Sequence, residues 1–313
     1  GFASGFTGLA LLWALMGAAQ AGIFPCATKA IGATFPKTEQ ALASGLLACC
    51  MSGGAALSQA VTGALFGPLT WRGILAVYAV PGLVWAGAFA LVVPRPDAPR
   101  PAETAREPIP WGRLLTDRNL LLLCAQQFQR AAATAFLFTW LPRFLQETKQ
   151  LSAAESGGYA SWPLLAGIPG GLLGGAISDW VLKRTGRVRL SRAGLSAAAM
   201  VVATVASAFA YVADTAAAVV VLVSVAAFCA YVAGPMAYAV ALSMGGPRPT
   251  RVFATMNMAG NVGAGFFPFA VGQLVGATGD WNSAVLLFAA LFAGTAVCWA
   301  LLDPAAMLYE ESP

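Results

Sequence analysis

Nine long apolar segments follow one another along this 313-residue chain. A helix needs about 20 mostly apolar residues to cross a lipid bilayer, and its backbone must satisfy its own hydrogen bonds there. The alternating polarity of outer-membrane barrel strands is absent from these segments. We therefore predict an all-α transmembrane protein. Its nine spans cover residues 7–33, 41–66, 73–94, 119–146, 153–182, 191–213, 216–244, 252–276 and 283–302.

The composition supports a lipid-embedded protein and excludes several other classes. Hydrophobic residues make up 58% of the chain and charged residues 10%, which is less than half of the charge that soluble globular proteins carry. The net charge of +5 is spread over several short loops, which argues against nucleic-acid binding. No histidine is present and the six cysteines show no CxxC spacing. We therefore expect no metal, no cofactor and no enzymatic activity.

Basic residues predict how the chain is oriented in the membrane. Thirteen of them lie in alternate loops, at 34–40, 95–118, 183–192 and 245–251. The other loops and nearby helix ends hold three, which are Arg72, Arg143 and Lys149. Because cytoplasmic loops carry the excess of lysine and arginine, we assign the first set to the cytoplasm of a multi-pass plasma-membrane protein, the inner membrane in a bacterium. Gly1 then lies outside and Pro313 inside.

An internal repeat predicts how the spans are organised. The segment from Gly63 to Arg72 is similar to the one from Gly272 to Asn282, and six predicted spans separate the two. Transporters with two parallel six-helix halves show this pattern. We therefore expect the chain to be a fragment that lacks three preceding spans. The predicted parts are the end of the N-terminal half (1–94, spans 4–6), a cytoplasmic linker (95–118), and the C-terminal half with a short tail (119–313, spans 7–12).

Several motifs occur in an order found in one transporter family. They are the stretch from Gly17 to Pro25, Thr70-Trp71-Arg72, Gln127-Phe128, Thr139 to Pro142, Gly174 to Asp179, and Asn257 to Pro268. This order resembles the anion:cation symporter family of the major facilitator superfamily, which includes sugar-acid permeases and vesicular glutamate transporters. The resemblance implies a major facilitator fold of two six-helix halves. It also implies secondary transport of a small organic anion, a sugar acid or another carboxylate, by alternating access.

The sequence leaves other functions open. A uniporter or an exporter of another small solute would have the same spans, and so would a transporter-like membrane sensor. A membrane enzyme is disfavoured, because no histidine and no acid pair within the spans is present. We expect a monomer that has the bilayer, a small organic anion and, if transport is coupled, protons as partners.

Arg130 is the most informative single residue. It lies eleven residues into its predicted span, about 16 Å deep at 1.5 Å per residue, where an arginine is costly and normally faces a cavity or a partner. No acid of the nine spans lies at comparable depth. Arg130 is therefore either an anion-binding group or the partner of an acid in the preceding spans. Its spacing to Pro142 matches a substrate-linked arginine of the vesicular glutamate transporters.

Five other residues are candidates for contact with the substrate. Gln127 lies one helical turn before Arg130 on the same face and matches a substrate-contacting glutamine of sugar-acid permeases. Asn257 and Asn261 are similar to asparagines of the family's eleventh span, although polar contacts between helices explain all three residues equally well. Tyr238 is a weaker candidate. Gln20 stands where relatives carry a glutamate implicated in proton coupling, and an amide cannot carry a proton.

A second group of residues indicates a conformational role. Gly175, Asp179, Lys183 and Arg184 resemble the superfamily's cytoplasmic gate motif, in which the acid caps a helix or pairs with an arginine. Gly167 and Gly171 precede Gly175 at intervals of four residues, with two further glycines beside them. This spacing predicts a smooth face on which another helix packs closely, either as a moving or as a static contact.

Overall fold

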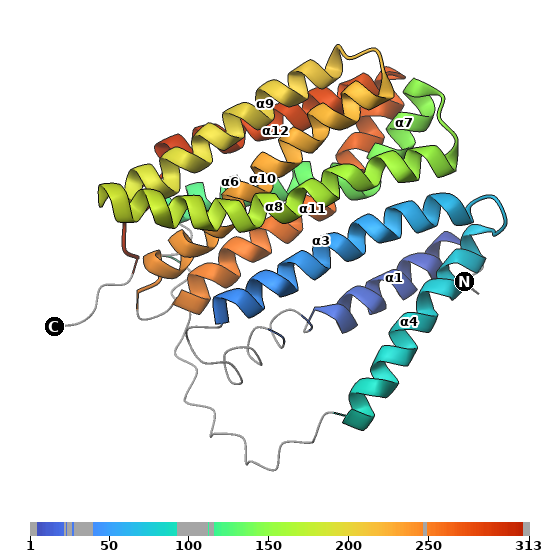
Figure 1. The fold of residues 1–313 in the computed structure, drawn as a ribbon, viewed down its shortest axis with the longest axis horizontal. Helices are drawn as coiled ribbons and strands as arrows, with labels where there is room; N and C mark the ends of the chain where they lie inside the picture. The colour runs from blue at the N-terminus through green and yellow to red at the C-terminus, as the bar shows by residue number, and fades with distance from the viewer. Residues whose placement is uncertain are drawn as a thin grey trace. The chain divides into compact units, whose positions relative to one another are not determined.

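The computed structural model describes residues 5–21, 23, 27, 40–92, 112, 116–246 and 249–308. Within these ranges the chain is helical (Figure 1). The elements are α1 (Phe6–Gln20), α3 (Gln40–Leu65), α4 (Trp71–Val92), α6 (Arg118–Thr139), α7 (Leu141–Lys149), α8 (Ala153–Thr185), the π-helical turn η1 (Leu190–Gly194), α9 (Leu195–Tyr211), α10 (Ala216–Met244), α11 (Pro249–Thr278) and α12 (Asn282–Leu301). The end of the first predicted span, the loop at 34–39 and most of the linker 95–118 lie outside the described residues.

Six of the described helices are long and apolar enough to cross a membrane. They are Trp71–Val92, Ala153–Thr185, Leu190–Tyr211, Ala216–Met244, Arg251–Thr278 and Asn282–Leu301. Among the other predicted spans, α1 is a shorter apolar helix of 15 residues. The helix α6 carries three glutamines and Arg130 in its middle, which lowers its hydropathy. Nine spans and two six-helix halves therefore stay a prediction.

The predicted span 119–146 is wrong as a single helix. The helix α6 ends at Thr139, and α7 begins at Leu141 after the intervening Trp140. Pro142, in the first turn of α7, has no backbone N–H to donate to the carbonyl of Phe138, and proline is favoured at helix starts. The side-chain amide of Gln59 donates to that Phe138 carbonyl at 3.0 Å instead.

The contacts divide the chain into two units, of which the first comprises residues 1–44 and 64–111. No residue of α1 is buried, and Ile74 is the buried residue of α4. Large apolar side chains such as Leu83, Trp85 and Leu91 are more than 70% exposed. An apolar surface of this extent requires an apolar surrounding, which a bilayer supplies.

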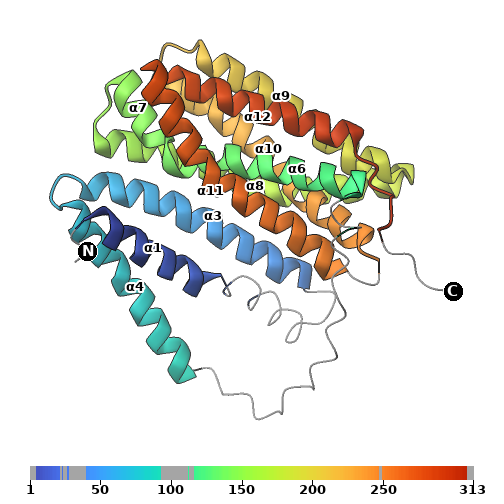
Figure 2. The ribbon, with the colours of Figure 1, turned by 180° about the vertical axis from the view of Figure 1, so that it is seen from behind.

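The second unit comprises residues 45–63 and 112–313 and holds the main core. Its helices form a closed series of neighbours in which α10 packs on α9, α9 on α12, α12 on α6, α6 on α11, and α11 on α10, while α8 packs on α10. Figures 1 and 2 show α9 beside α12 from both sides. Polar side chains such as Gln127 and Arg130 are buried here, whereas Trp162, Phe209 and Val221 are about 60% exposed. This arrangement suits a protein surrounded by lipid.

One of the close helix contacts in this unit joins α8 to α10. A Cβ added to Gly170 would lie 2.6 Å from the carbonyl oxygen of Phe228, and one on Gly174 would overlap the backbone of Val232. Nothing lies within 4 Å of such an atom on Gly171, and Gly175 has only an ordinary contact with Pro235. The close face is thus Gly167, Gly170 and Gly174 rather than the predicted series at intervals of four, because a Cβ on each of these three would lie within 3.0 Å of an atom of α10.

Candidate functional site

The helix α6 carries the central candidate residues into the core. Asp117 caps its N-terminus, since the carboxylate accepts a hydrogen bond from the Leu120 backbone N–H at 2.8 Å. One face of the helix is buried, and this face includes Gln126, Gln127 and Arg130. Arg130 is 9% exposed. Burying a guanidinium costs free energy unless charge and hydrogen bonds compensate it, so the partners of Arg130 define the site.

Arg130 has few partners in the structure. Its Nη2 donates to Oε1 of Gln127 at 2.7 Å, and its Nη1 lies 3.4 Å from the carbonyl oxygen of Ala230. The first bond confirms that Gln127 and Arg130 share a face, as their spacing predicted. Its Nε is buried and has no partner in the structure. Within the described ranges no aspartate or glutamate forms an ion pair with Arg130, so the charge is left without a counter-ion there.

The helix α10 forms the second wall of the site. Pro235 interrupts its backbone hydrogen bonding one turn beyond Ala230. A Cβ on Gly234 would lie 3.7 Å from Nη1 of Arg130, so this glycine faces the guanidinium. Tyr231 packs on Gly167 of α8. It is also hydrogen-bonded to Ser52 of α3 and lies within electrostatic range of Arg130.

Tyr231 and Ser52 were not predicted from the sequence. Both lie on apolar helices where a single hydroxyl carries no distinctive signal, and they meet only through packing of α3, α8 and α10. Tyr238, which was predicted, lies two turns further along α10 and is 36% exposed. Its ring packs against that of Phe253, with the centroids 5.2 Å apart.

The helix α11 forms the third wall. A Cβ on Gly260 would lie 3.0 Å from Cγ of Gln127, so this glycine gives Gln127 the space that it occupies. Asn257 is half-buried and Asn261 is exposed. In the part of the chain that the structure describes, neither side-chain amide has a hydrogen-bond partner. Both amides are therefore available to a ligand.

The other polar residues near the site lie elsewhere. Gln129 points to α12, where its amide donates to Sγ of Cys298 at 3.5 Å. Gln126 donates to the carbonyl of Leu123 within its own helix. Gln20 is the exposed last residue of α1 and belongs to the first unit, whereas Arg130, Gln127, Asn257, Asn261 and Tyr238 belong to the second.

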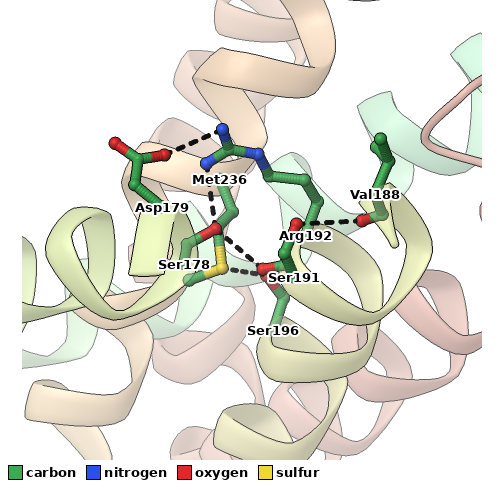
Figure 3. Close-up of polar contacts among 7 residues, drawn as sticks. All are labelled: Ser178, Asp179, Val188, Ser191, Arg192, Ser196 and Met236. Atoms are coloured by element: carbon green, nitrogen blue, oxygen red, sulfur yellow. Dashed lines mark hydrogen bonds and ion pairs between the residues drawn. The ribbon is translucent and has the colours of Figure 1, made fainter. Parts of the chain in front are cut away.

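A polar network joins the end of α8 to the π-helical turn η1 (Figure 3). The guanidinium of Arg192 donates to Oδ1 of Asp179 and to Oγ of Ser178, both at 2.9 Å. Ser178 in turn donates to the carbonyl of Ser191 at 2.7 Å. Arg192, which the sequence indicated only as a topology charge, is thus the partner of Asp179. The loop after α8 begins at Gly186, whose backbone is in the left-handed conformation. The contact between Arg192 and Asp179 joins the two ends of this loop.

The remaining residues of the predicted gate motif take no part in this network. The guanidinium of Arg184 lies 5.6 Å from the centre of the Trp180 ring, a cation–π arrangement. Lys183 is exposed, and Gly175 faces Pro235. Asp179 thus pairs with an arginine in the structure, and the role of the four residues in gating stays a prediction.

The chemistry of the central site favours an anion with hydroxyl groups. Arg130 supplies hydrogen-bond donors in a planar fork that matches a carboxylate, and Gln127, Asn257 and Tyr231 supply groups that both donate and accept. Within the described ranges no cluster of three or more His, Cys, Asp or Glu could hold a metal ion. The site can thus bind and orient a small anion.

Two transporters of other bacteria are similar to the chain over most of its length. A probable sulfoacetate transporter of Cupriavidus necator is 26% identical to the chain over 335 residues, which cover 100% of this chain and 76% of that protein. A probable galactarate/D-glucarate transporter of Escherichia coli is 25% identical, with coverages of 91% and 70%.

The fold is similar to a solved transporter structure, and a family model matches most of the chain. The structure is that of a bacterial homologue of the human lysosomal transporter Spinster, with a TM-score of 0.69, 18% identity, and coverages of 96% of this chain and 76% of that one. The family model matches residues 1–244. On this match, the chain belongs to the Major Facilitator Superfamily.

Proposed function

We propose that the protein is a secondary transporter of a small organic anion of the sugar-acid type, a multi-pass protein of the bacterial inner membrane. Its similarity to proteins named as sulfoacetate and galactarate/D-glucarate transporters supports this substrate class. Transport proceeds by alternating access between two six-helix halves, of which residues 1–94 and 119–313 form parts and 95–118 the linker. Proton coupling is a further part of this proposal.

The buried guanidinium of Arg130 carries the proposal. Among the described residues its Nε has no hydrogen-bond partner and no acid balances its charge, so the group can still donate to an anion. A substrate carboxylate or sulfonate supplies that charge and accepts from the fork. Gln127, Asn257 and Asn261 then hold the hydroxyl groups, and Tyr238 lines the path beyond them.

The network at the end of α8 serves as the conformational contact. Asp179 and Arg192 pair at a membrane edge, where Asp179 is largely exposed. Pairs of this exposure contribute little stability, about 0–1 kcal/mol. A contact this weak can therefore open and close during a transport cycle at low energetic cost. Gly175, Lys183 and Arg184, the other residues of the motif, serve this conformational role rather than substrate binding.

The test is uptake of labelled galactarate, D-glucarate and sulfoacetate by the full-length protein in proteoliposomes. Because hydrogen bonds to charged groups contribute about 1.5–3 kcal/mol, Arg130→Ala should weaken anion transport at least tenfold. Arg143→Ala is the matched control. Arg143 lies on α7 in the same predicted span, is exposed and pairs with Glu147, so its loss should change uptake less than twofold.

The same assay separates the alternatives. Concentrative uptake that requires Arg130 supports the proposed function. Equilibration without accumulation indicates a uniporter, and efflux without uptake indicates an exporter. Binding without any flux indicates a sensor. Uptake that is unchanged in Arg130→Ala would contradict the assigned site.

A further inference from the structure

A groove lies at the end of the second unit that carries the basic loop 183–192. It is distinct from the site around Arg130. It has a volume of about 680 Å³ and runs between the start of α9 and the end of α12. This size falls within the range of about 300–1,000 Å³ that is typical of small-molecule sites. The proposed transport function does not involve it.

The wall of this groove has two chemically distinct parts. Arg187 and Arg189 line one part, and apolar residues such as Leu190, Ala193 and Ala197 line the other. Leu190 is 48% exposed, whereas Ala193 is 3% exposed, so Leu190 forms the open side of the apolar part and Ala193 its floor. The groove thus combines a positively charged end with an apolar channel along α9.

The two arginines differ in how their side chains are held. Nη2 of Arg189 donates to the carbonyl oxygen of Ala300 at 3.4 Å, which holds its side chain over the end of α12. In the described part of the chain, the Arg187 guanidinium has no hydrogen bond or ion pair. Asp303 lies near Ala305 of the wall, and its carboxylate accepts from the Ala305 backbone N–H at 3.1 Å. The arginine pair therefore keeps free donors.

A tryptophan near the end of α8 indicates how deep this end of the unit lies in the membrane. Trp180 is 59% exposed and stands under the guanidinium of Arg184. Tryptophan is enriched at the boundary between lipid and water, where its ring lies among the headgroups. The positive-inside distribution assigns this boundary to the cytoplasmic leaflet. Anionic headgroups of that leaflet bind basic pockets between transmembrane helices.

We propose that this groove binds an anionic phospholipid of the cytoplasmic leaflet. The phosphate lies between Arg187 and Arg189, and one acyl chain follows Leu190, Ala193 and Ala197 along α9. The two parts of the wall match the two parts of such a lipid. A soluble phosphate would use only the charged end and would leave the apolar channel unfilled.

The experiment measures phosphatidylglycerol and phosphatidylcholine binding to the purified full-length protein in detergent by native mass spectrometry. One arginine near the surface changes the affinity for anionic lipid about fivefold, so the double variant R187A/R189A should lose about 25-fold. The matched control K183A/R184A removes two charges from the same loop but not from the groove, and it should lose less than threefold. Ala197→Phe fills the apolar channel at unchanged charge and should weaken binding at least fivefold.

Each outcome supports or overturns the proposal. Preference for phosphatidylglycerol that is lost in R187A/R189A and kept in K183A/R184A supports it. Equal losses in the two double variants would indicate general surface charge and overturn it. Displacement by glycerol phosphate at concentrations equal to the lipid would overturn it as well. Lipid binding that appears only after residues 309–313 are removed would also overturn the proposal. Glu310 and Glu311 of that segment would then be the occupant of the groove. If Ala197→Phe does not fold, the double variants R187A/R189A and K183A/R184A, which change exposed residues, decide the result.

Discussion

Replacing Gly174 by alanine should loosen the contact between α8 and α10. The added Cβ would lie 2.7 Å from the Cα of Val232 and overlap its carbonyl oxygen. Both are backbone atoms that cannot turn away, so the two helices must separate. Overpacking of this kind costs about 1–3 kcal/mol, and the better helix propensity of alanine returns up to about 1 kcal/mol. Because the added atom meets backbone at two points, the cost lies at the upper end of that range, and we expect a net loss of about 2 kcal/mol.

The assay is thermal unfolding of the purified protein in detergent. A loss of about 2 kcal/mol corresponds to a Tm lowered by about 4–8 °C in chains of 150–250 residues. Gly171→Ala is the matched control on the same helix, because nothing lies within 4 Å of its added Cβ. It should keep or raise the Tm. A Gly174→Ala protein that melts with the wild type, or a Gly171→Ala protein that melts below it, would refute the assignment of the packed face.

Three further predictions concern topology, coupling and the network at the end of α8. In a cysteine-free background, Arg106→Cys should react with an impermeant maleimide only after the cells are permeabilised, because the positive-inside rule puts it in the cytoplasm; labelling of intact cells would overturn the topology. Gln20→Glu should change the pH dependence of uptake because it adds a titratable carboxyl group, and an unchanged profile with intact uptake would speak against a coupling role. Arg192→Ala should lower the Tm by more than Asp179→Asn, because it leaves both Ser178 and Asp179 without their donor; equal losses would contradict this.

The helices were predictable where the apolar pattern ends at the same positions as the residues that favour helix starts and helix ends. The span 216–244 matches α10 because Thr215 caps its start by accepting from the Ala218 N–H and Gly245 follows its end. The break at Trp140 was not predicted, because the flanking residues are apolar and continue the pattern. Pro142 could have indicated it, since proline favours the first turn of a helix.

The candidate site was predictable along one helix and not between helices. Gln127 and Arg130 meet because residues three apart on a helix are neighbours. Tyr231 and Gly260 reach the same place from α10 and α11, and only the packing of those helices brings them there. The role of Gly170 and Gly174 rather than Gly171 depends on the side from which α10 approaches. A spacing of four residues in the sequence cannot specify that side.

The most direct test of the central claim is the thermal stability of the purified full-length Arg130→Ala protein, with and without substrate. At 100 times its Kd, a ligand stabilises the wild type by about 2.7 kcal/mol. In Arg130→Ala this shift should vanish. The unliganded protein should lose only about 1–3 kcal/mol, because Oε1 of the buried Gln127 is left without a donor. If Arg130 instead pairs with an acid outside the described residues, the variant should lose about 3–5 kcal/mol. A collapse of the Tm that is rescued by neutralising such an acid, or a substrate shift that survives in Arg130→Ala, would contradict the account.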